Sequence, residues 1–345
     1  KPKLIMAPGM PNTAAADGVA SVTVTTPGSG YGENTTIAVT GDAGSGKGAV
    51  LQPVVIDGKL DAVIVANPGY GYTAPLAITV TDPDGGADAV CAGTVGQVKS
   101  ALVAESSSVT DSLRAMFYTD GPDSTDADAV AMRALIGDKR VFFCDGRVLK
   151  SVDGLPTPMA SSVVHAGMQS VMDVKEGPHW TGSNQVVNSI LGTNRPVNYG
   201  AQSNYLNANR INTIVNLDGL RTWGVWTCAD DPIWQFVNVV RTTDVVNETL
   251  ETALRRFTDR PGNKMSLDFA VMTGQRTFKD FENDGMLLPG SEFSVASSNS
   301  PEKAVLGWYA FDTAFEVPSP MAQIDVTAHR NITVGYTLLF NAFTG

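Results

Sequence analysis

The segment Gly41–Lys47 carries residue types that could bind a phosphate. Its sequence, GDAGSGK, fills the first seven positions of the P-loop pattern, in which glycine N–H groups and a lysine surround a nucleotide's phosphates. The next residue is Gly48, where that pattern has the Ser or Thr that binds magnesium. A P-loop also needs a helix after it, and Ala49–Pro53 is short and strand-like. We therefore interpret the segment as a flexible β-turn and expect no cofactor.

Metal-binding and hydrolytic patterns are weak. The three histidines, His165, His179 and His329, show none of the short His or Cys spacings of zinc sites. Asp82–Gly85 resembles the start of a calcium loop but lacks the later bidentate Glu. A Ser–His–Asp triad stays open, although no GxSxG segment supports it. We therefore expect no metal site and no enzyme activity.

Two groups of side chains have a functional and a structural interpretation. Asp230 and Asp231 could pair as acid and base, but capping a helix or forming a salt bridge is the better interpretation. Trp223, Trp226 and Trp234 could form a carbohydrate platform, but a place in the core is the simpler expectation.

Composition argues against nucleic-acid and membrane partners. The net charge is −11, whereas binding to phosphates or anionic headgroups needs clustered Lys and Arg. There is no signal peptide and no run of about 18 apolar residues that could insert into a membrane. Charged residues are only 17%, below the usual quarter, which suits a surface partly covered by copies of the same chain.

Length and cysteines set further limits. A chain of 345 residues is expected to hold two or three domains. Its three cysteines, Cys91, Cys144 and Cys228, are odd in number and widely spaced, so we expect free thiols. The first residue is Lys1 rather than Met, from which we expect a fragment or a processed product.

Residues 13–96 are expected to form an inserted all-β sandwich or barrel. Gly, Thr, Val and Ala dominate, and apolar and polar residues alternate between turn residues. Val22–Tyr31 (VTVTTPGSGY) is repeated as Val63–Tyr72 (VIVANPGYGY), at an offset of 41 residues. The repeated Pro-Gly-x-Gly-Tyr is interpreted as a turn with a packed Tyr rather than as a ligand motif.

Mixed α/β structure is expected from residue 97. We predict a helix near 105–113, buried strands at Ala115–Thr119 and Val141–Cys144, and a helix from Asp126 to Ile136 capped by Ser124 or Thr125. The strand–helix–strand order implies parallel pairing. Ala160–Val174 is expected to be a helix, and residues 177–210 an ordered connection.

The stretch Arg221–Phe257 is the centre of the C-terminal part. We predict a buried aromatic strand followed by an amphipathic helix, capped by Thr242, Thr243 or Asp244, with its apolar face starting at Val246. A helix is then predicted over Leu267–Asp284, ended by Gly285. Two long strands, Val305–Val317 and Ile324–Phe340, are predicted to close the chain.

The same stretch resembles the C-terminal domain of contractile phage tail sheath proteins. The residues that carry this resemblance are Arg221, Trp223, Gly224, Thr227, Asp231, Pro232, Trp234, Phe236, Val239, Arg241, Thr242 and Asp244. Val240 departs from the family, which usually has a second Arg there. The other segments that resemble the family are Lys3–Gly9, Tyr118–Asp126, Ser183–Asn184 with Arg195–Val197, and Ala310–Pro318 with Pro320–Ile324. Residues 13–96 are outside the resemblance.

The resemblance implies a structural subunit that polymerises into a helical tube around the tail tube protein. Contraction of that tube would drive the inner tube through the host envelope during genome delivery. It also implies baseplate and tail terminator partners, no cofactor, and a virion protein assembled in the host cytoplasm. The fold expected is α+β, with an opening strand at 1–12, the inserted β-domain at 13–96, an α/β domain at 97–215 and an α+β domain at 216–345.

Subunit contacts are expected at two groups of residues. Sheath subunits add a terminal strand to a neighbour's sheet, and Ile324, Val326, Tyr336, Leu338 and Phe340 are the candidates here. Arg241, Asp244, Arg255, Arg256 and Asp230 are candidates for ion pairs between subunits or within the chain. Two alternatives stay open: the sheath of a related contractile device, bacteriocin-like or a secretion system, and a glycan-binding module.

Overall fold

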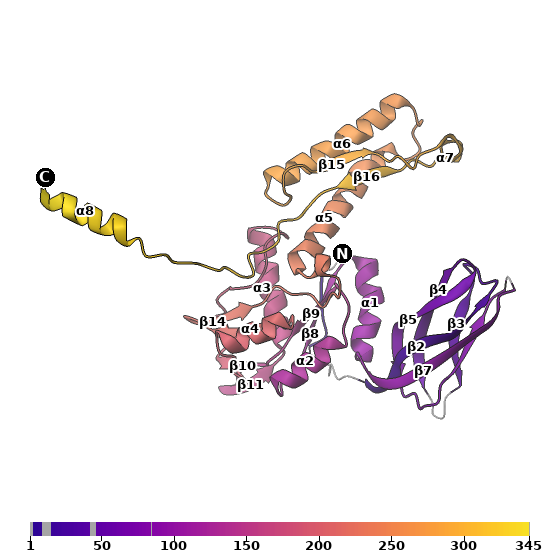
Figure 1. Cartoon of the computed structure of the whole chain (residues 1–345), viewed down its shortest axis with the longest axis horizontal. Helices are drawn as coiled ribbons and strands as arrows, with labels where there is room; N and C mark the ends of the chain where they lie inside the picture. The colour runs from indigo at the N-terminus through magenta and orange to yellow at the C-terminus, as the bar shows by residue number, and fades with distance from the viewer. Residues whose placement is uncertain (1–2, 9–14, 42–45, 84, 345) are drawn as a thin grey trace.

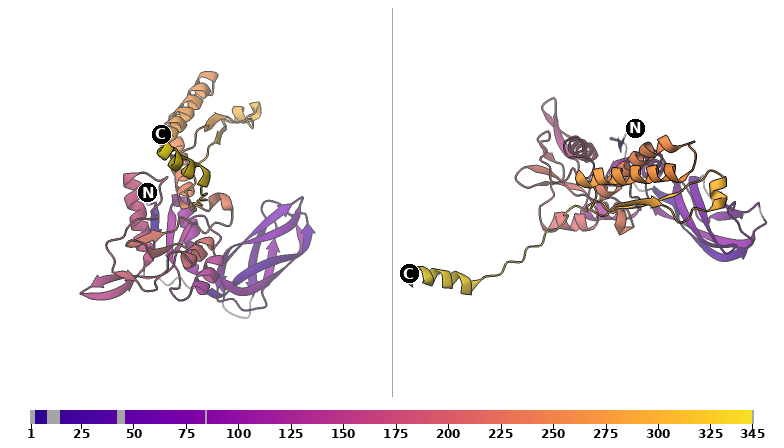
Figure 2. Two further views of the ribbon diagram at one scale, coloured as in Figure 1. Left: turned by 60° about the vertical axis from the view of Figure 1, so that its left-hand side comes forward. Right: turned by 90° about the horizontal axis from the view of Figure 1, so that it is seen from above.

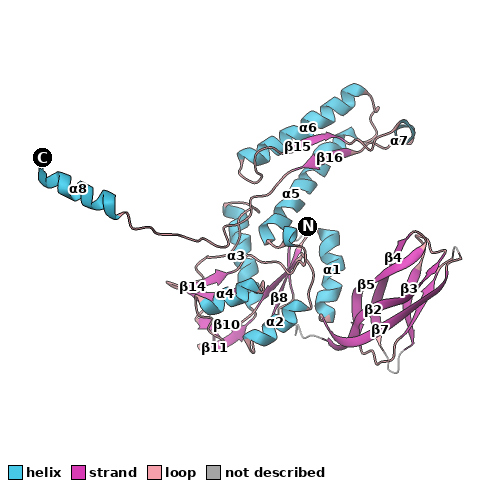
Figure 3. Ribbon diagram, in the orientation of Figure 1, coloured by secondary structure: helices cyan, strands magenta, loops and turns pink. Residues whose placement is uncertain are grey.

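The computed structural model describes residues 3–8, 15–41, 46–83 and 85–344. Helices and strands are mixed along these residues, as Figures 1 and 3 show. The expected mixed α+β class is therefore confirmed. The opening strand and the Gly41–Lys47 loop are only partly described, because Gly9 and residues 42–45 lie outside these ranges.

A parallel three-stranded sheet lies at the centre of the chain. Its order is β1 (Leu4–Met6), β8 (Met116–Asp120) and β9 (Val141–Cys144), and Tyr118 is opposite Phe142. β9 is fully buried and β8 nearly so, which explains their continuous apolar sequences. The predicted strands and their parallel pairing are confirmed.

Three helices flank this sheet: α1 (Ala101–Leu113), α2 (Asp126–Ala134) and α3 (Ser161–Lys175). Each was predicted within a few residues. The Thr125 hydroxyl caps α2 by accepting from the Asp128 N–H at 3.1 Å, which satisfies a donor that the first turn leaves free. The connection predicted for residues 177–210 also contains α4, a short helix over Ala201–Ala208.

Short antiparallel strands extend this central part. They are β10 (Val148–Val152), β11 (Leu155–Met159) and β12 (Gly192–Thr193) in one sheet, and β13 (Thr213–Asn216) and β14 (Leu220–Trp223) in another. The aromatic stretch after β14 is therefore mostly irregular, not a long strand, and contains the 3₁₀ turn η1 (Pro232–Trp234). Asp231 caps this turn by accepting from the Ile233 N–H at 2.9 Å, which confirms the capping interpretation for that residue.

Helix α5 begins at Val237 and runs to Leu254, so the predicted cap at Thr242, Thr243 or Asp244 is wrong. Val237 and Val240 pack into a core cluster beside β8 and β9. The burial of these two side chains explains why the helix begins more than a turn before the predicted cap. Phe236, the residue that precedes the helix, provides no side-chain cap.

The C-terminal part packs around the far end of α5. The 3₁₀ turn η2 (Arg255–Phe257) leads to α6 (Lys264–Asn283), and β15 (Glu292–Val295) pairs with β16 (Phe311–Ala314). The predicted strand Val305–Val317 is wrong in its extent. Ser300 caps a short helix, α7 (Pro301–Val305), and only Phe311–Ala314 pairs in a ladder.

Residues 15–98 form six antiparallel strands. They are β2 (Ala15–Ser29), β3 (Thr36–Gly41), β4 (Lys47–Ile56), β5 (Lys59–Tyr70), β6 (Ala77–Thr81) and β7 (Ala87–Val98). β2 pairs with β7, and the other four form a sheet in the order β5-β4-β3-β6. Their buried side chains, such as Val19, Leu51 and Leu60, make a cluster that shares no residue with the other three core clusters.

The sequence repeat has the same geometry twice. The Ala89 N–H donates to the Tyr31 hydroxyl at 3.0 Å, and the Ala49 N–H donates to the Tyr72 hydroxyl at 3.1 Å. Both rings are buried, as expected for a turn with a packed Tyr. Gly28 and Gly69 stand at φ +62° and +61°, a conformation that favours glycine.

Candidate assembly surfaces

The last residues leave the C-terminal part as an arm. Val317 is buried in the core cluster around α5 and α6, and the Asn238 side-chain amide donates to the Pro318 carbonyl oxygen at 2.9 Å. Beyond this point the described chain runs without regular structure to α8 (Ile332–Thr344). Figures 1 and 2 show this arm pointing away from the rest of the molecule. Pro318 is therefore where the arm leaves the folded part.

The prediction of a strand over Ile324–Phe340 is wrong for this chain by itself. Residues 324–331 have no regular structure, and α8 is a helix, whose backbone N–H and C=O groups pair within one segment. Its apolar side chains are exposed: Ile324 by 70%, Val326 by 84%, Tyr336 by 54%, Leu338 by 66% and Phe340 by 62%. The five candidate contact residues of the arm thus remain accessible to a partner.

Two of the charged candidates, Arg241 and Asp244, form ion pairs with residues of the same chain. The Arg140 guanidinium donates to both Asp244 oxygens, at 2.7 and 3.0 Å, and also to Asp111 at 2.7 Å. Arg241 donates to Asp173 of α3 at 2.6 Å. Hydrogen bonds and attraction to these carboxylates raise the pKa of each arginine against the opposing effect of burial. Arg241 and Asp244 therefore stabilise the packing of α5, and a contact with another subunit remains untested.

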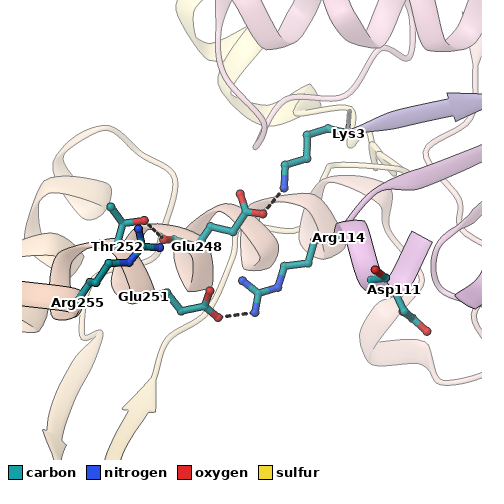
Figure 4. A pocket seen from close by; sticks show the side chains of 8 residues that line it. Lys3, Asp111, Arg114, Glu248, Glu251, Thr252 and Arg255 are labelled. Atoms are coloured by element: carbon teal, nitrogen blue, oxygen red, sulfur yellow. Dashed lines mark hydrogen bonds and ion pairs between the residues drawn. The ribbon is translucent and has the colours of Figure 1, made fainter. Parts of the chain in front are cut away.

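Two further ion pairs continue this charged side of α5. Lys3 pairs with Glu248, and Arg114 pairs with Glu251. They border a pocket of about 450 Å³, in which Figure 4 shows both pairs and Arg255. The helical spacing of Arg241, Asp244, Glu248 and Glu251 is a signal that could have predicted this row from the sequence.

The remaining basic candidates lie at the end of α5. Arg255 and Arg256 are exposed, and the Arg256 guanidinium donates to the Thr273 hydroxyl at 3.3 Å. Their proposed role in subunit contacts stays a prediction. Asp230 lies beside Gly137, where an added Cβ would be 2.1 Å from its carboxylate.

The family-like segments of the central part make a second charged network. Arg195 pairs with Asp126 and Asp145, and burial raises the pKa of the Asp145 carboxyl while Arg195 lowers it. The Asp120 carboxylate accepts from the Ser162 N–H at 2.9 Å, at the start of α3. These segments therefore meet around the ends of β8 and β9, which their separate positions in the sequence did not reveal.

The family-like residues near Arg221 fix backbone segments to one another. The Thr222 hydroxyl donates to the Gly182 carbonyl at 2.6 Å, and the Gly224 N–H donates to the Ser183 hydroxyl at 3.0 Å. Gly224 stands at φ +128°, and an added Cβ would be 2.3 Å from the Asn212 side chain. The expected core position is found for Trp223 and Trp234, which pack against core clusters. Trp226 is in none of these clusters and packs on Phe236, with ring centroids 5.1 Å apart.

The described residues that were considered for chemistry have the following structural contexts. A strand, β4, follows Lys47 where a P-loop would have a helix. Cys91, Cys144 and Cys228 are free, as expected. Among the described residues, no group of three or more His, Cys, Asp or Glu side chains could hold a metal ion. The Asp82 carboxylate accepts from the Gly32 N–H at 2.8 Å and from the Thr35 hydroxyl at 3.0 Å, so it joins two distant segments of the chain. Over the same residues, no helix is long and apolar enough to cross a membrane.

Comparison with known proteins gives consistent results. No family model matches the chain. A putative prophage major tail sheath protein of Pseudomonas aeruginosa (strain UCBPP-PA14) is 31% identical over 229 residues, which are 63% of this chain and 59% of that protein. The tail sheath protein of Escherichia phage P2 is 27% identical over 175 residues, which are 49% of this chain and 44% of that protein. The chain thus spans three fifths or less of these two relatives.

The fold has a match among solved structures. The contracted helical sheath of the anti-feeding prophage is 18% identical, with a TM-score of 0.57 over 67% of this chain and 66% of that chain. Both named relatives are tail sheath proteins, and the matched solved structure is a contractile sheath. Over the matched part of its length, the chain is a relative of the contractile phage tail sheath proteins, so the resemblance expected from its motifs is confirmed.

Proposed function

We propose that the chain is a subunit of a contractile phage tail sheath. Many copies polymerise helically around a tail tube protein, between a baseplate and a tail terminator. Contraction of this assembly drives the tube through the host envelope during genome delivery. The protein is part of the virion and assembles in the host cytoplasm.

The arm is the observation that carries this proposal. It holds exposed apolar side chains on a segment that points away from its own subunit. Heterologous contacts, in which a segment of one copy binds a different surface of the next, generate open helical assemblies. An arm that leaves its own subunit supports such a head-to-tail contact.

A neighbour's β15–β16 hairpin is the acceptor we propose. Among the described residues this is a two-stranded sheet. The Gln275 amide of α6 donates to the Phe293 carbonyl of β15 at 3.3 Å, so the outer edge of β16 is the one that we propose for pairing. β11 is a poorer acceptor. Pro156 and Pro158 lie at alternate positions of this edge strand and have no N–H to offer a new strand. Because β11 lacks these two N–H donors, the β15–β16 hairpin is the better acceptor for a strand.

The division of the chain is part of the proposal. Residues 1–12 supply the opening strand, 97–215 the α/β domain and 216–345 the C-terminal α+β domain. Residues 13–96 are an inserted all-β domain that faces outward. Its separate core cluster supports this, and so does its contact with the rest through Asn67, whose amide donates to Glu105 of α1 at 3.0 Å.

Electron microscopy of the purified, concentrated full chain tests the proposal. We expect striated hollow tubes from the wild-type chain. Deleting 324–345 or substituting Leu338→Asp should abolish them. Val174→Asp is the matched control, because Val174 is also apolar and 89% exposed but lies on α3, so its tubes should persist. A wild-type chain that stays monomeric at high concentration contradicts the proposal.

The sheath of a related contractile device remains the second candidate. The match to the anti-feeding prophage sheath favours it as an alternative, although at this identity the match concerns the fold. Genes for phage capsid proteins beside this gene would support the phage tail, and their absence beside genes for a secreted contractile particle would support the alternative.

A further inference from the structure

The residue pattern of α8 is typical of a β-strand. Its apolar residues at the start of α8 are spaced two apart: Ile332, Val334, Tyr336, Leu338 and Phe340. The residues between them are Thr333, Gly335 and Thr337, and the alternation with small or polar residues breaks only at Leu339. Such alternation puts all five on one face of a strand, where successive side chains point to opposite sides. In a helix of 3.6 residues per turn the same positions spread over opposite sides. The pattern therefore suits the strand and not the helix.

Local preferences oppose the helix as well. Thr333, Val334 and Thr337 are β-branched, and Gly335 lies in the interior of α8, where glycine costs about 1 kcal/mol relative to alanine. α8 has no acidic residue in its first turn and no basic residue in its last turn to stabilise its ends. An isolated helix of 13 residues is marginal in water even for a favourable sequence.

Packing does not compensate for these preferences. Val334 is 52% exposed and Leu339 is 48% exposed, so neither side of the helix is covered. Figure 1 and the right-hand view of Figure 2 show α8 at the end of an extended segment, far from the other helices. The helix persists because it satisfies its backbone N–H and C=O groups within one segment, whereas a strand needs a second strand to do so.

We infer that residues 332–344 are a conformational switch, held as a helix in the free subunit and converted to a strand when a second copy accepts the arm. This inference rests on the proposed function and adds how the contact is regulated. The helical form offers no free row of N–H and C=O groups, so it limits pairing with arbitrary strand edges before assembly. The acceptor edge supplies the missing backbone partners, and the alternating side chains then share one buried face.

The test changes helix preference without touching the five alternating side chains. The variant Thr333→Ala/Gly335→Ala/Thr337→Ala favours the helix at each position, and a Cβ at Gly335 meets no atom within 4 Å. The critical concentration for tube formation is measured by sedimentation of the full chain. We expect an increase of between about tenfold and about a hundredfold, because each of the three changes shifts the helix balance by a factor of roughly two to five.

Two controls separate the switch from other effects. Thr249→Ala/Thr252→Ala makes the same kind of change on the exposed side of α5 and should leave the critical concentration unchanged. Thr333→Val/Thr337→Val keeps the helix preference similar and suits a strand, so it should leave the critical concentration equal or lower it.

The outcomes distinguish the switch from the sheath function. If the wild-type chain forms tubes and the triple-alanine variant forms them at the same or a lower concentration, the arm docks as a helix or by another route, and the switch is refuted. If the wild-type chain forms no tubes, the proposed function itself fails. Faster hydrogen exchange of residues 332–344 in tubes than in free subunits would also refute the switch, since a paired strand is protected.

Discussion

Asp244 of α5 holds Arg140 at the start of β9 through a bidentate ion pair, with oxygen–nitrogen distances of 2.7 and 3.0 Å. Only 10% and 9% of these side chains are exposed. The pair joins α5 to the central sheet. The Arg241–Asp173 pair, which joins α5 to α3, also involves this helix. Asp244 and Arg241, which belong to the family-like motif, therefore stabilise the packing of α5 against the central sheet and α3.

Removing one member of this pair should destabilise the chain strongly. In Asp244→Ala the Arg140 guanidinium stays buried with Asp111 as its remaining partner, and we expect a loss of about 3 kcal/mol in the free energy of unfolding. Urea denaturation followed by tryptophan fluorescence measures this loss. The double variant Arg140→Met/Asp244→Leu should recover most of it, because it leaves no buried charge unpaired.

An exposed ion pair provides the control for this effect. Lys264 and Asp268 pair on the surface of α6, where 89% and 58% of their side chains are exposed. Lys264→Ala should therefore change the free energy of unfolding by less than about 0.5 kcal/mol. Similar losses in Asp244→Ala and Lys264→Ala would contradict a stabilising role for the buried pair.

The duplicated tyrosine turns should respond alike to the same substitution. Tyr31→Phe and Tyr72→Phe each remove the hydroxyl that accepts a strand N–H, and each should cost about 1 kcal/mol or more. Tyr70→Phe is the control, because that ring is 53% exposed. Hydrogen exchange of β4 and β7 measures the effect. Unequal losses would show that the two repeats are not energetically equivalent.

The buried histidine should make stability depend on pH. Burial lowers the pKa of His165 to about 4, below the value near 6.5 of an unfolded chain. Between these values only the unfolded chain binds the proton, so stability is full above pH 6.5 and falls by on the order of 3 kcal/mol as pH decreases to 4.

Replacing this side chain isolates its contribution to the pH profile. His165→Gln should flatten the profile between pH 6.5 and 4 relative to wild type, whatever its effect at pH 8. His329→Gln should keep the wild-type slope, because His329 is exposed on the arm. Urea midpoints measured across this range decide the question. An unchanged slope in His165→Gln would mean that other groups cause the acid sensitivity.

The central sheet and its helices could be predicted from the sequence because their signals are local. The buried strands are short and mostly apolar, and Thr125 marks the start of α2 as its residue type suggests. The start of α5 could not be found this way. Val237 and Val240 extend the helix through contacts with β8 and β9, which no local pattern specifies.

The contact residues could be predicted only in part, for a related reason. Arg241 and Asp244 were found as motif positions, but their partners Asp173 and Arg140 come from distant segments. The arm was predicted as a strand from its alternating side chains, but residues 324–331 are irregular and α8 is a helix. A strand needs a partner strand for its backbone N–H and C=O groups, and a local residue pattern does not specify that partner.

Opening the β11 edge should create a new site of self-association. Pro156 and Pro158 lie opposite Ser151 and Leu149 of β10, at the positions whose N–H groups would face away from the partner strand. Pro156→Val/Pro158→Val would therefore supply two outward N–H donors on an exposed edge and should produce irregular aggregates, measured by light scattering at concentrations where wild type is clear. Thr157→Val is the matched control, because it adds an apolar β-branched side chain while its N–H still faces β10. Aggregation of the control to the same extent would mean that hydrophobic surface, and not the free edge, causes association.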